Sequence, residues 1–217
     1  RSTTGAASVL YDVVNSRLSC KKRTYVCFID FSKCFDTIRR DLLFIKLQTL
    51  GIPYEICKLI HFIYKKLRFV IKSGGLLTKE FSTSIGLPQG DPLSPVLFGL
   101  FVHDLPLCFK HLGPKLNDCY INYLMFADDL AIIAESEYEL QHAIDALMAY
   151  CDKNGLKINS SKSKCMVFHR GRLPPCSFKI KSSDLELVNN FNYLGFHFTT
   201  QLSFSTHLNA AVVKANA

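Results

Sequence analysis

The sequence predicts an α+β fold in which an antiparallel sheet is backed by helices. Two short apolar runs indicate the sheet: Thr24–Ile29, which is followed directly by Asp30, and Leu130–Ile133, which follows the pair Asp128 and Asp129. Several segments with apolar residues at helical spacing indicate the helices. Because 48% of the 217 residues are hydrophobic, the chain is able to bury a sizeable core.

The first half of the chain is expected to alternate helix and strand. A helix over Thr4–Ser19 is predicted because its apolar residues recur three and four positions apart. The strand Thr24–Ile29 comes next, and two helices follow, Asp41–Leu50 and Tyr54–Lys66, the first ended by Gly51. The run Ser73-Gly74-Gly75 then provides the turn of a hairpin.

In the second half, a helix after a Pro/Gly-rich loop is expected to extend to about Phe109 and to precede a hairpin that carries the two adjacent aspartates. Ser136 and Glu139 form a capping box that begins a helix ending at Asn154, before Gly155. Strands are also expected at Cys165–His169, Phe178–Ile180 and Tyr193–Thr199, and a last helix is expected to begin near Ser205.

Three aspartates are candidates for a metal site. Ionised carboxylates beside apolar strands are costly to bury unless a cation meets them. If the two strands converge, Asp30, Asp128 and Asp129 form a cluster of hard oxygen ligands suited to Mg²⁺. Such a cluster leaves positions for phosphate oxygens, so the expected chemistry is phosphoryl or nucleotidyl transfer. The alternative is that the pair belongs to an ordinary solvated turn.

The loop Gly86–Pro95 contains two glycines and three prolines directly before an apolar helical run. Glycines let backbone approach a ligand closely, and proline is tolerated in a first helical turn. Gln89 in this loop is placed to touch a nucleotide or a base edge. The alternative is that the cluster only punctuates a loop.

Five motifs in order resemble the reverse transcriptase domain of non-LTR (LINE-like) retrotransposons. They are Phe28–Asp36 (FIDFSKCFD), Gly86–Pro95 (GLPQGDPLSP), Phe126–Ile133 (FADDLAII), Asn154–Lys164 (NGLKINSSKSK) and Tyr193–Gly195 (YLG). Together they cover nearly the whole chain, which favours a common origin over chance. The resemblance implies a single domain over residues 1–217, a fragment consisting of a right-hand polymerase palm with part of the fingers and without the thumb.

The resemblance also assigns roles to residues. It makes Asp30, Asp128 and Asp129 catalytic and metal-binding, with two Mg²⁺ ions, or Mn²⁺ in their place, and adds the backbone carbonyl of Phe31 as a ligand. Lys162 is catalytic and contacts the nucleotide, where it neutralises or protonates departing pyrophosphate. By its local sequence alone, Lys162 is one more solvated charge.

Further positions bind the nucleotide and the primer by the same resemblance. Phe35 matches a sugar gate whose ring crowds a ribose 2′-OH, and Gln89 and Gly90 bind the nucleotide. Tyr193, Leu194 and Gly195 form a turn that grips the primer. Taken alone, Phe35 reads as a core residue and Tyr193–Gly195 as part of a strand.

Two residues depart from the family pattern. Cys34 replaces a commoner alanine, a small apolar exchange of little consequence. Asp91 stands where a small residue often follows the Gln-Gly pair. Its charge is expected to weaken nucleotide binding unless the carboxylate points toward Arg or Lys.

A formal net charge of +8 favours a polyanionic partner. The basic residues that could follow a nucleic-acid backbone are Lys21, Lys22, Arg23, Arg39, Arg40, Lys65, Lys66, Arg68, Lys162, Lys164, Arg170 and Arg172. Such residues also make ordinary soluble surfaces. Nine cysteines without zinc or disulfide spacing indicate a reducing, intracellular compartment, the nucleus or the cytoplasm. No apolar run is long enough for a membrane span.

Three functions follow as hypotheses. The first is an RNA-directed DNA polymerase with an RNA template, a DNA primer and dNTPs as partners, and with no membrane; the sequence specifies no oligomeric state. The second is a truncated, non-catalytic nucleic-acid-binding remnant of such an element. The third is a protein-interaction domain, which predicts an exposed apolar patch.

Overall fold

The computed structural model describes residues 3–110, 112–116 and 119–202. The chain forms two compact units. Unit 1 comprises Arg1–Ser32, Leu105–Asp152 and Ile158–Ala217, and unit 2 comprises Lys33–Asp104 and Lys153–Lys157. Helices and strands occur together, which confirms the mixed α and β character that the sequence predicts.

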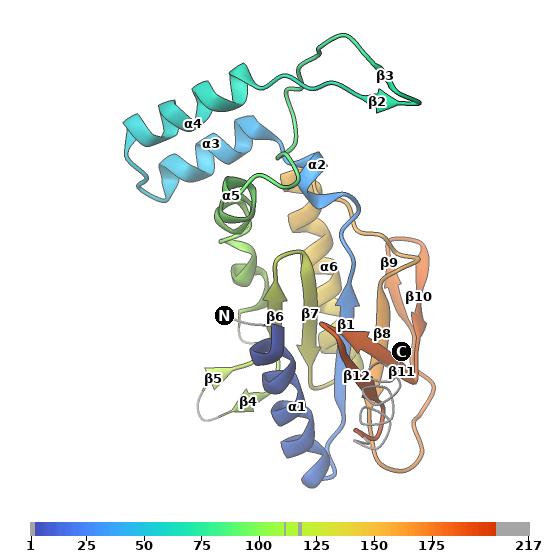
Figure 1. Cartoon of the computed structure of the whole chain (residues 1–217). Helices are drawn as coiled ribbons and strands as arrows, with labels where there is room; N and C mark the ends of the chain where they lie inside the picture. The colour runs from blue at the N-terminus through green and yellow to red at the C-terminus, as the bar shows by residue number, and fades with distance from the viewer. Residues whose placement is uncertain (1–2, 111, 117–118, 203–217) are drawn as a thin grey trace. The chain divides into compact units, whose positions relative to one another are not determined.

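Unit 1 is built on a six-stranded sheet of order β6-β7-β1-β8-β10-β9 (Figure 1). Its strands are β1 (Thr24–Ile29), β6 (Tyr123–Phe126), β7 (Asp129–Ala134), β8 (Lys164–Phe168), β9 (Phe178–Ile180) and β10 (Ser183–Leu187). The central strand β1 pairs antiparallel with both β7 and β8, whereas β8 and β10 run parallel. All six residues of β1 are buried, which explains its unbroken apolar sequence.

Helices and a hairpin cover the two faces of this sheet. Buried side chains of α1 (Thr3–Ser19) share a core with Val26 and Phe28 of β1 and with the hairpin of β11 (Asn190–Tyr193) and β12 (Phe196–Thr199). Figure 1 shows α6 (Glu137–Asn154) on the opposite face. A 3₁₀ helix (Leu105–Phe109) and the short strands β4 (Lys115–Leu116) and β5 (Cys119–Tyr120) complete the described part of unit 1.

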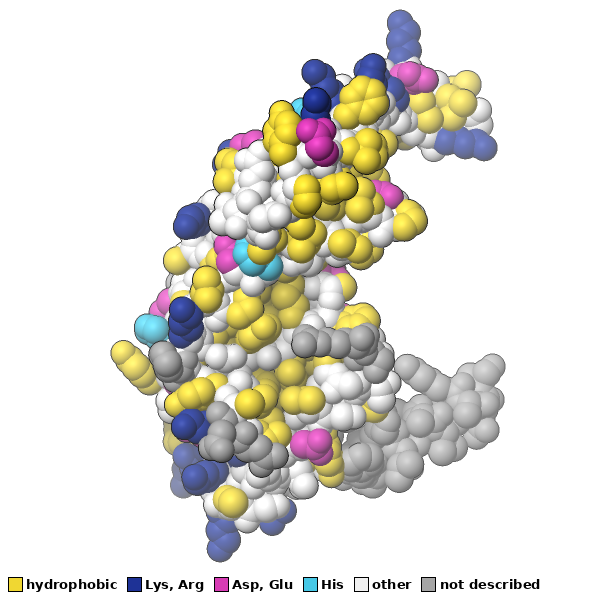
Figure 2. Space-filling model, turned by 90° about the vertical axis from the view of Figure 1, so that its left-hand side faces the viewer, with side chains coloured by type: hydrophobic (Ala, Val, Ile, Leu, Met, Phe, Trp, Pro, Cys, Tyr) yellow, Lys and Arg dark blue, Asp and Glu magenta, His cyan; other side chains and the backbone are white. Residues whose placement is uncertain are grey.

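Unit 2 is mainly helical. It contains α2 (Cys34–Thr37), α3 (Arg40–Thr49), α4 (Tyr54–Lys66), the hairpin of β2 (Lys72–Ser73) and β3 (Leu76–Leu77), and α5 (Leu93–Phe101). Helix α3 packs against both α4 and α5. The outer face of α4 exposes five apolar side chains, which appear among lysines and arginines in the upper part of Figure 2. They are Tyr54, Ile56, Leu59, Phe62 and Ile63.

Most predicted elements are confirmed, some with shifted ends. The helices near Thr4–Ser19, Asp41–Leu50, Tyr54–Lys66 and Ser136–Asn154, the hairpin at Gly74-Gly75 and the Asp-Asp hairpin are present. In the capping box, the N–H of Glu139 donates to Ser136 Oγ over 3.2 Å. The strand predicted at Cys165–His169 runs from Lys164 to Phe168, and Phe178–Ile180 is confirmed.

Two predictions about extent are wrong. The helix expected to continue to Phe109 ends at Phe101, and a 3₁₀ helix follows; Pro106 lacks the N–H that a continuing α-helix requires. The single strand expected at Tyr193–Thr199 is the two-stranded hairpin of β11 and β12, because Leu194 and Gly195 both adopt positive φ and turn the chain. The helix expected near Ser205 lies outside the described residues.

Within the described ranges, no helix has the combination of length and apolar character needed to cross a bilayer.

Candidate active site

Asp128 and Asp129 lie at the tip of the β6–β7 hairpin. Phe126 pairs with Asp129, so that Ala127 and Asp128 form a two-residue turn. Ala127 has φ +52°, as tight hairpin turns of this length require. The fold therefore holds two consecutive carboxylates at the end of a hairpin, as the sequence predicts.

Asp30 is brought to these carboxylates by strand register. β1 and β7 are antiparallel, and their last pair is Ile29 with Leu130. Continuing that register by one residue sets Asp30 opposite Asp129. Positions about one hundred residues apart in the chain thus meet at one edge of the sheet.

The main chain of Asp30 is held on both sides by the turn Asn159–Ser163. The N–H of Asn159 donates to the carbonyl of Asp30 over 2.8 Å, and the N–H of Asp30 donates to Ser163 Oγ over 3.1 Å. Ser163 is fully buried, and its own N–H closes the turn onto the Asn159 carbonyl over 2.9 Å. Lys162 lies inside this turn, so the same contacts place Lys162 beside Asp30.

One pocket is lined by Asp30, Asp129 and Lys162 and by Tyr193 and Leu194 of the β11–β12 hairpin, whereas Asp128 is not among its lining residues. Aromatic contacts among the lining residues hold the hairpin: the ring of Phe28 stacks on Phe191 with centroids 4.2 Å apart and lies 5.3 Å from Tyr193. The hydroxyl of Tyr193 donates to the carbonyl of Leu124 over 3.4 Å.

The electrostatics of the pocket are dominated by negative charge. Partial burial raises the pKa of Asp129 above its ordinary value, and the charges of Asp128 and Asp30 raise it further. The pKa of Tyr193 is also raised, mainly by burial and then by the charge of Asp129. A cation in the pocket would relieve this repulsion.

The donor set fits a hard divalent cation. Carboxylate oxygens are the ligands that Mg²⁺ prefers, and Mg²⁺ commonly uses one or two of them and completes its shell with water and phosphate. Among the described residues, no group of three or more His, Cys, Asp or Glu side chains is already arranged as a metal cage.

Asp129→Asn is expected to raise the melting temperature by about 1–3 °C in EDTA at pH 7, because it removes a partly buried charge and its repulsion with Asp128 and Asp30. Since the pKa of Asp129 is raised in the folded state, the cost of its charge appears as the pH rises past the unfolded pKa of about 4 and is constant above the folded-state pKa. The gain should therefore vanish below about pH 4. Thermal melts at both pH values check this.

Asp184→Asn is the matched control for that measurement, because Asp184 is exposed and pairs with Lys179 at 3.7 Å on the surface. Its melting temperature should stay close to that of the wild type. A lower melting temperature for Asp129→Asn at pH 7 would contradict the repulsion argument.

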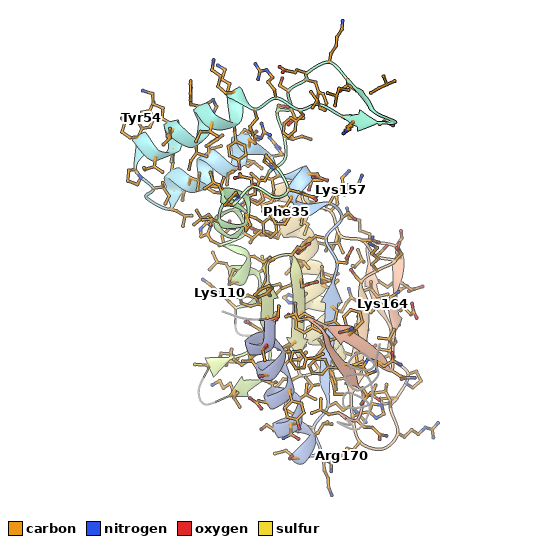
Figure 3. All side chains as sticks on the ribbon, viewed as in Figure 1. Phe35, Tyr54, Lys110, Lys157, Lys164 and Arg170 are labelled. Carbon is orange, nitrogen blue, oxygen red and sulfur yellow. The ribbon has the colours of Figure 1, made fainter. Side chains whose placement is uncertain are left out.

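The predicted nucleotide-binding residues Phe35, Gln89 and Gly90 all belong to unit 2. The N–H of Leu87 donates to the carbonyl of Phe35 over 2.7 Å, and Gln89 Nε2 donates to Asp36 Oδ1 over 3.3 Å. The ring of Phe35, labelled in Figure 3, lies 4.9 Å from that of Phe98 and remains partly exposed. The structure thus joins two segments that are fifty residues apart in the chain.

Among the ion pairs of the described residues, none joins Asp91 to Arg or Lys. Its carboxylate accepts hydrogen bonds from the hydroxyls of Tyr64 and Ser94, both at 3.2 Å, and from the N–H of Leu93, also at 3.2 Å. These bonds hold the carboxylate at the start of α5, where a helix N-terminus stabilises negative charge. The negative charge of Asp91 is therefore stabilised by hydrogen bonds within unit 2.

Sequence reasoning missed several residues that build the site. Asn159 and Ser163 clamp Asp30, and Asp36 binds Gln89. All three lie within motifs already recognised, but short polar residues of this kind signal only a turn. Each of them contacts a residue that is distant in the chain, and the local sequence does not indicate which residue that is.

The sheet is mixed, because β8 and β10 run parallel, and not wholly antiparallel as the sequence predicts. Carboxylates at the ends of two neighbouring strands are nevertheless suited to the two-metal chemistry that nucleic-acid polymerases use. Residues 5–198 match the family model described as reverse transcriptase (RNA-dependent DNA polymerase). The chain belongs to the reverse transcriptase family, and its resemblance to the non-LTR retrotransposon enzymes is confirmed.

Known relatives agree with this placement. The chain is 30% identical over 190 residues to the Pol polyprotein of the type-2 retrotransposable element R2DM of Drosophila melanogaster, covering 81% of this chain and 18% of that protein. It is 26% identical over 213 residues to the RNA-directed DNA polymerase from mobile element jockey of Drosophila funebris, covering 94% and 23%. The chain therefore spans about a fifth of the length of these relatives.

A solved structure shares the fold. Telomerase from Candida tropicalis, truncated from its C-terminal domain, aligns with a TM-score of 0.66 at 15% identity, over 94% of this chain and 40% of that one.

Proposed function

We propose that this chain is the polymerase core of a non-LTR retrotransposon reverse transcriptase, which extends a DNA primer on an RNA template. The reaction is attack of the primer 3′-hydroxyl on the α-phosphate of a dNTP, with pyrophosphate leaving. The observation that carries the proposal is the pocket of unit 1, in which Asp30, Asp129 and Lys162 meet the turn at Tyr193–Leu194. Membership of the reverse transcriptase family supports it.

In this proposal Asp30 and Asp128 hold two divalent cations, Mg²⁺ or Mn²⁺. Asp129 lies beside them, and the carbonyl of Phe31 is a further ligand. When bound, such ions would lower the pKa of the primer hydroxyl and neutralise charge on the phosphates. The clamp of Asn159 and Ser163 on the main chain of Asp30 supports this role, because it keeps that ligand from moving.

Lys162 and the β11–β12 turn have complementary roles. The Lys162 ammonium is placed to neutralise or protonate the departing pyrophosphate, and its position in the same pocket as Asp30 supports this. Tyr193, Leu194 and Gly195 brace the primer strand. Positive φ at both Leu194 and Gly195 makes this a tight turn, in keeping with the proposed primer grip.

In unit 2, Phe35, Gln89 and Gly90 bind the incoming nucleotide, with Phe35 as the sugar gate. Phe35→Ala is expected to improve the use of rNTPs relative to dNTPs by about 10- to 100-fold, because the ring no longer crowds the 2′-hydroxyl. Steady-state incorporation of each dNTP and rNTP measures this ratio. Phe62→Ala, at an exposed ring on α4, is the control, and an unchanged ratio in Phe35→Ala would count against the gate.

Both units are proposed to form one reverse transcriptase domain that comprises the palm and part of the fingers. The family match over residues 5–198 supports a single domain because it runs through both units. An intracellular location, in the nucleus or the cytoplasm, is supported by the nine cysteines, all of which are free thiols.

The decisive assay is extension of a labelled DNA primer on an RNA template by the purified chain, with Mg²⁺ and with EDTA. Template-directed, Mg²⁺-dependent extension is expected. Salt-sensitive binding without extension, even at high primer concentration, would instead identify a non-catalytic remnant. The interaction-domain hypothesis accounts for the apolar face of α4 but for none of the carboxylate pocket, and absence of template–primer binding would favour it.

A further inference from the structure

Arg40 is a buried cation near the start of α3, with 7% of its surface exposed. Its guanidinium makes four hydrogen bonds within unit 2. Nε donates to the carbonyl of Gly86 over 2.8 Å, Nη1 to the carbonyls of Thr83 over 2.7 Å and Tyr64 over 3.3 Å, and Nη2 to Thr83 Oγ1 over 3.1 Å. One side chain thus joins the end of α4 to the segment that leads into the Pro/Gly-rich loop.

The charge of Arg40 has no carboxylate in direct contact among the ion pairs of the described residues. Instead, its guanidinium carbon lies 5.1 Å from the ring centre of Tyr64, whose hydroxyl donates to Asp91. Burial lowers the pKa of Arg40. A buried cation without a direct counter-ion is costly, so its hydrogen bonds to fixed carbonyls must be well aligned.

The segment that Arg40 holds carries the proposed nucleotide-binding residues. Gly86 N–H donates to the carbonyl of Ile38 over 2.8 Å, and Leu87 N–H donates to the carbonyl of Phe35 over 2.7 Å. The carbonyl of Gly86 belongs to the same peptide group as the Leu87 N–H, and it accepts the hydrogen bond from Arg40 Nε. Gln89 and Gly90 follow after Pro88, so their position relative to Phe35 depends on these bonds.

We propose that Arg40 is a positioning residue that fixes the Thr83–Gly90 segment against the Phe35 segment, and thereby sets nucleotide affinity and sugar selectivity. The proposal rests on the nucleotide-binding role proposed for Phe35 and Gln89. The planar fork of arginine donates in several fixed directions at once, whereas a lysine ammonium on a flexible stem does not reproduce them. Charge alone is therefore insufficient at this position.

The test compares Arg40→Lys with Arg17→Lys. Arg17 lies in unit 1, its side chain is only 12% exposed, and its guanidinium donates to the carbonyl of Arg23 over 2.7 Å and to Thr24 Oγ1 over 3.1 Å. It therefore matches the chemistry of Arg40 at a position outside the Thr83–Gly90 segment. In Arg40→Lys the KM for dNTPs should rise about 10-fold or more, the preference for dNTPs over rNTPs should fall, and kcat should change less. Arg17→Lys should retain the wild-type KM, kcat and sugar preference.

Hydrogen exchange separates this proposal from the proposed function, because it needs no catalysis. The amides of Gly86 and Leu87 should exchange faster in Arg40→Lys, while amides of the unit 1 sheet stay protected. If the wild type fails to extend a primer, the proposed function fails, and exchange alone decides the positioning role. Unchanged exchange at both amides, or unchanged KM and sugar preference in an active enzyme, overturns the proposal.

A second variant, Arg40→Gln, tests the proposal if Arg40→Lys does not fold. Arg40→Gln places no charge in the interior and keeps an amide group that can donate hydrogen bonds, so it is the milder change. Faster exchange at Gly86 and Leu87 in this variant supports the positioning role, and wild-type exchange rates refute it.

Discussion

Asp128→Asn is expected to lower primer extension at least about 10³-fold, since it removes a carboxylate from the proposed metal site. Asparagine keeps the size of the side chain and one oxygen, but it carries no charge to balance a divalent cation. The side chain lies at the tip of a two-residue turn and not in the core, so the fold should survive. Extension rates under single-turnover conditions measure the loss.

Asp30→Asn should produce a loss of similar size, and the double variant should be little worse than either single one. Residues that hold the same ions act as a unit, so their effects do not add. Asp184→Asn, an exposed aspartate paired with Lys179, is the matched control and should extend primers like the wild type. Equal extension by Asp128→Asn and the wild type would refute the assignment of the catalytic site.

Gly86→Ala is expected to destabilise the protein by about 2 to 4 kcal/mol. Gly86 has φ +84°, a conformation that costs a residue with a Cβ about 1–2 kcal/mol. A Cβ at this position would also lie 2.9 Å from the carbonyl oxygen of Asp36, and backbone has to move to accommodate it. Because Gly86 N–H and Leu87 N–H bind the Phe35 segment, the KM for dNTPs should rise as well.

Alanine substitutions at two other glycines should cost progressively less stability than Gly86→Ala. Gly90 has φ +86° with open space around its would-be Cβ, so Gly90→Ala should cost only the conformational part, about 1–2 kcal/mol. Gly99 is helical and also has open space, so Gly99→Ala should be neutral or stabilising by up to about 1 kcal/mol. Urea unfolding measures all three, and equal costs at Gly86 and Gly90 would show that the contact with Asp36 is unimportant.

Local patterns predicted the elements that carry the site. The strand before Asp30 and the hairpin at Asp128 follow from apolar runs and a turn, which depend on residues close in the chain. The β11–β12 hairpin was mistaken for one strand because leucine rarely adopts the positive φ that Leu194 has. Stacking of Phe191 on Phe28, more than 160 positions away, accompanies that turn and has no local signal.

By itself, the sequence determined which residues are acidic, which runs form strands and helices, and which family the motifs belong to, because propensity and spacing act over a few neighbouring residues. Only the tertiary structure decided that the Asn159–Ser163 turn binds the main chain of Asp30 and sets Lys162 beside it. It also decided that Arg40 is buried and donates a hydrogen bond to the carbonyl of Gly86. Those contacts join segments tens to more than one hundred residues apart. They arise from strand register and the packing of whole elements, which local sequence does not specify.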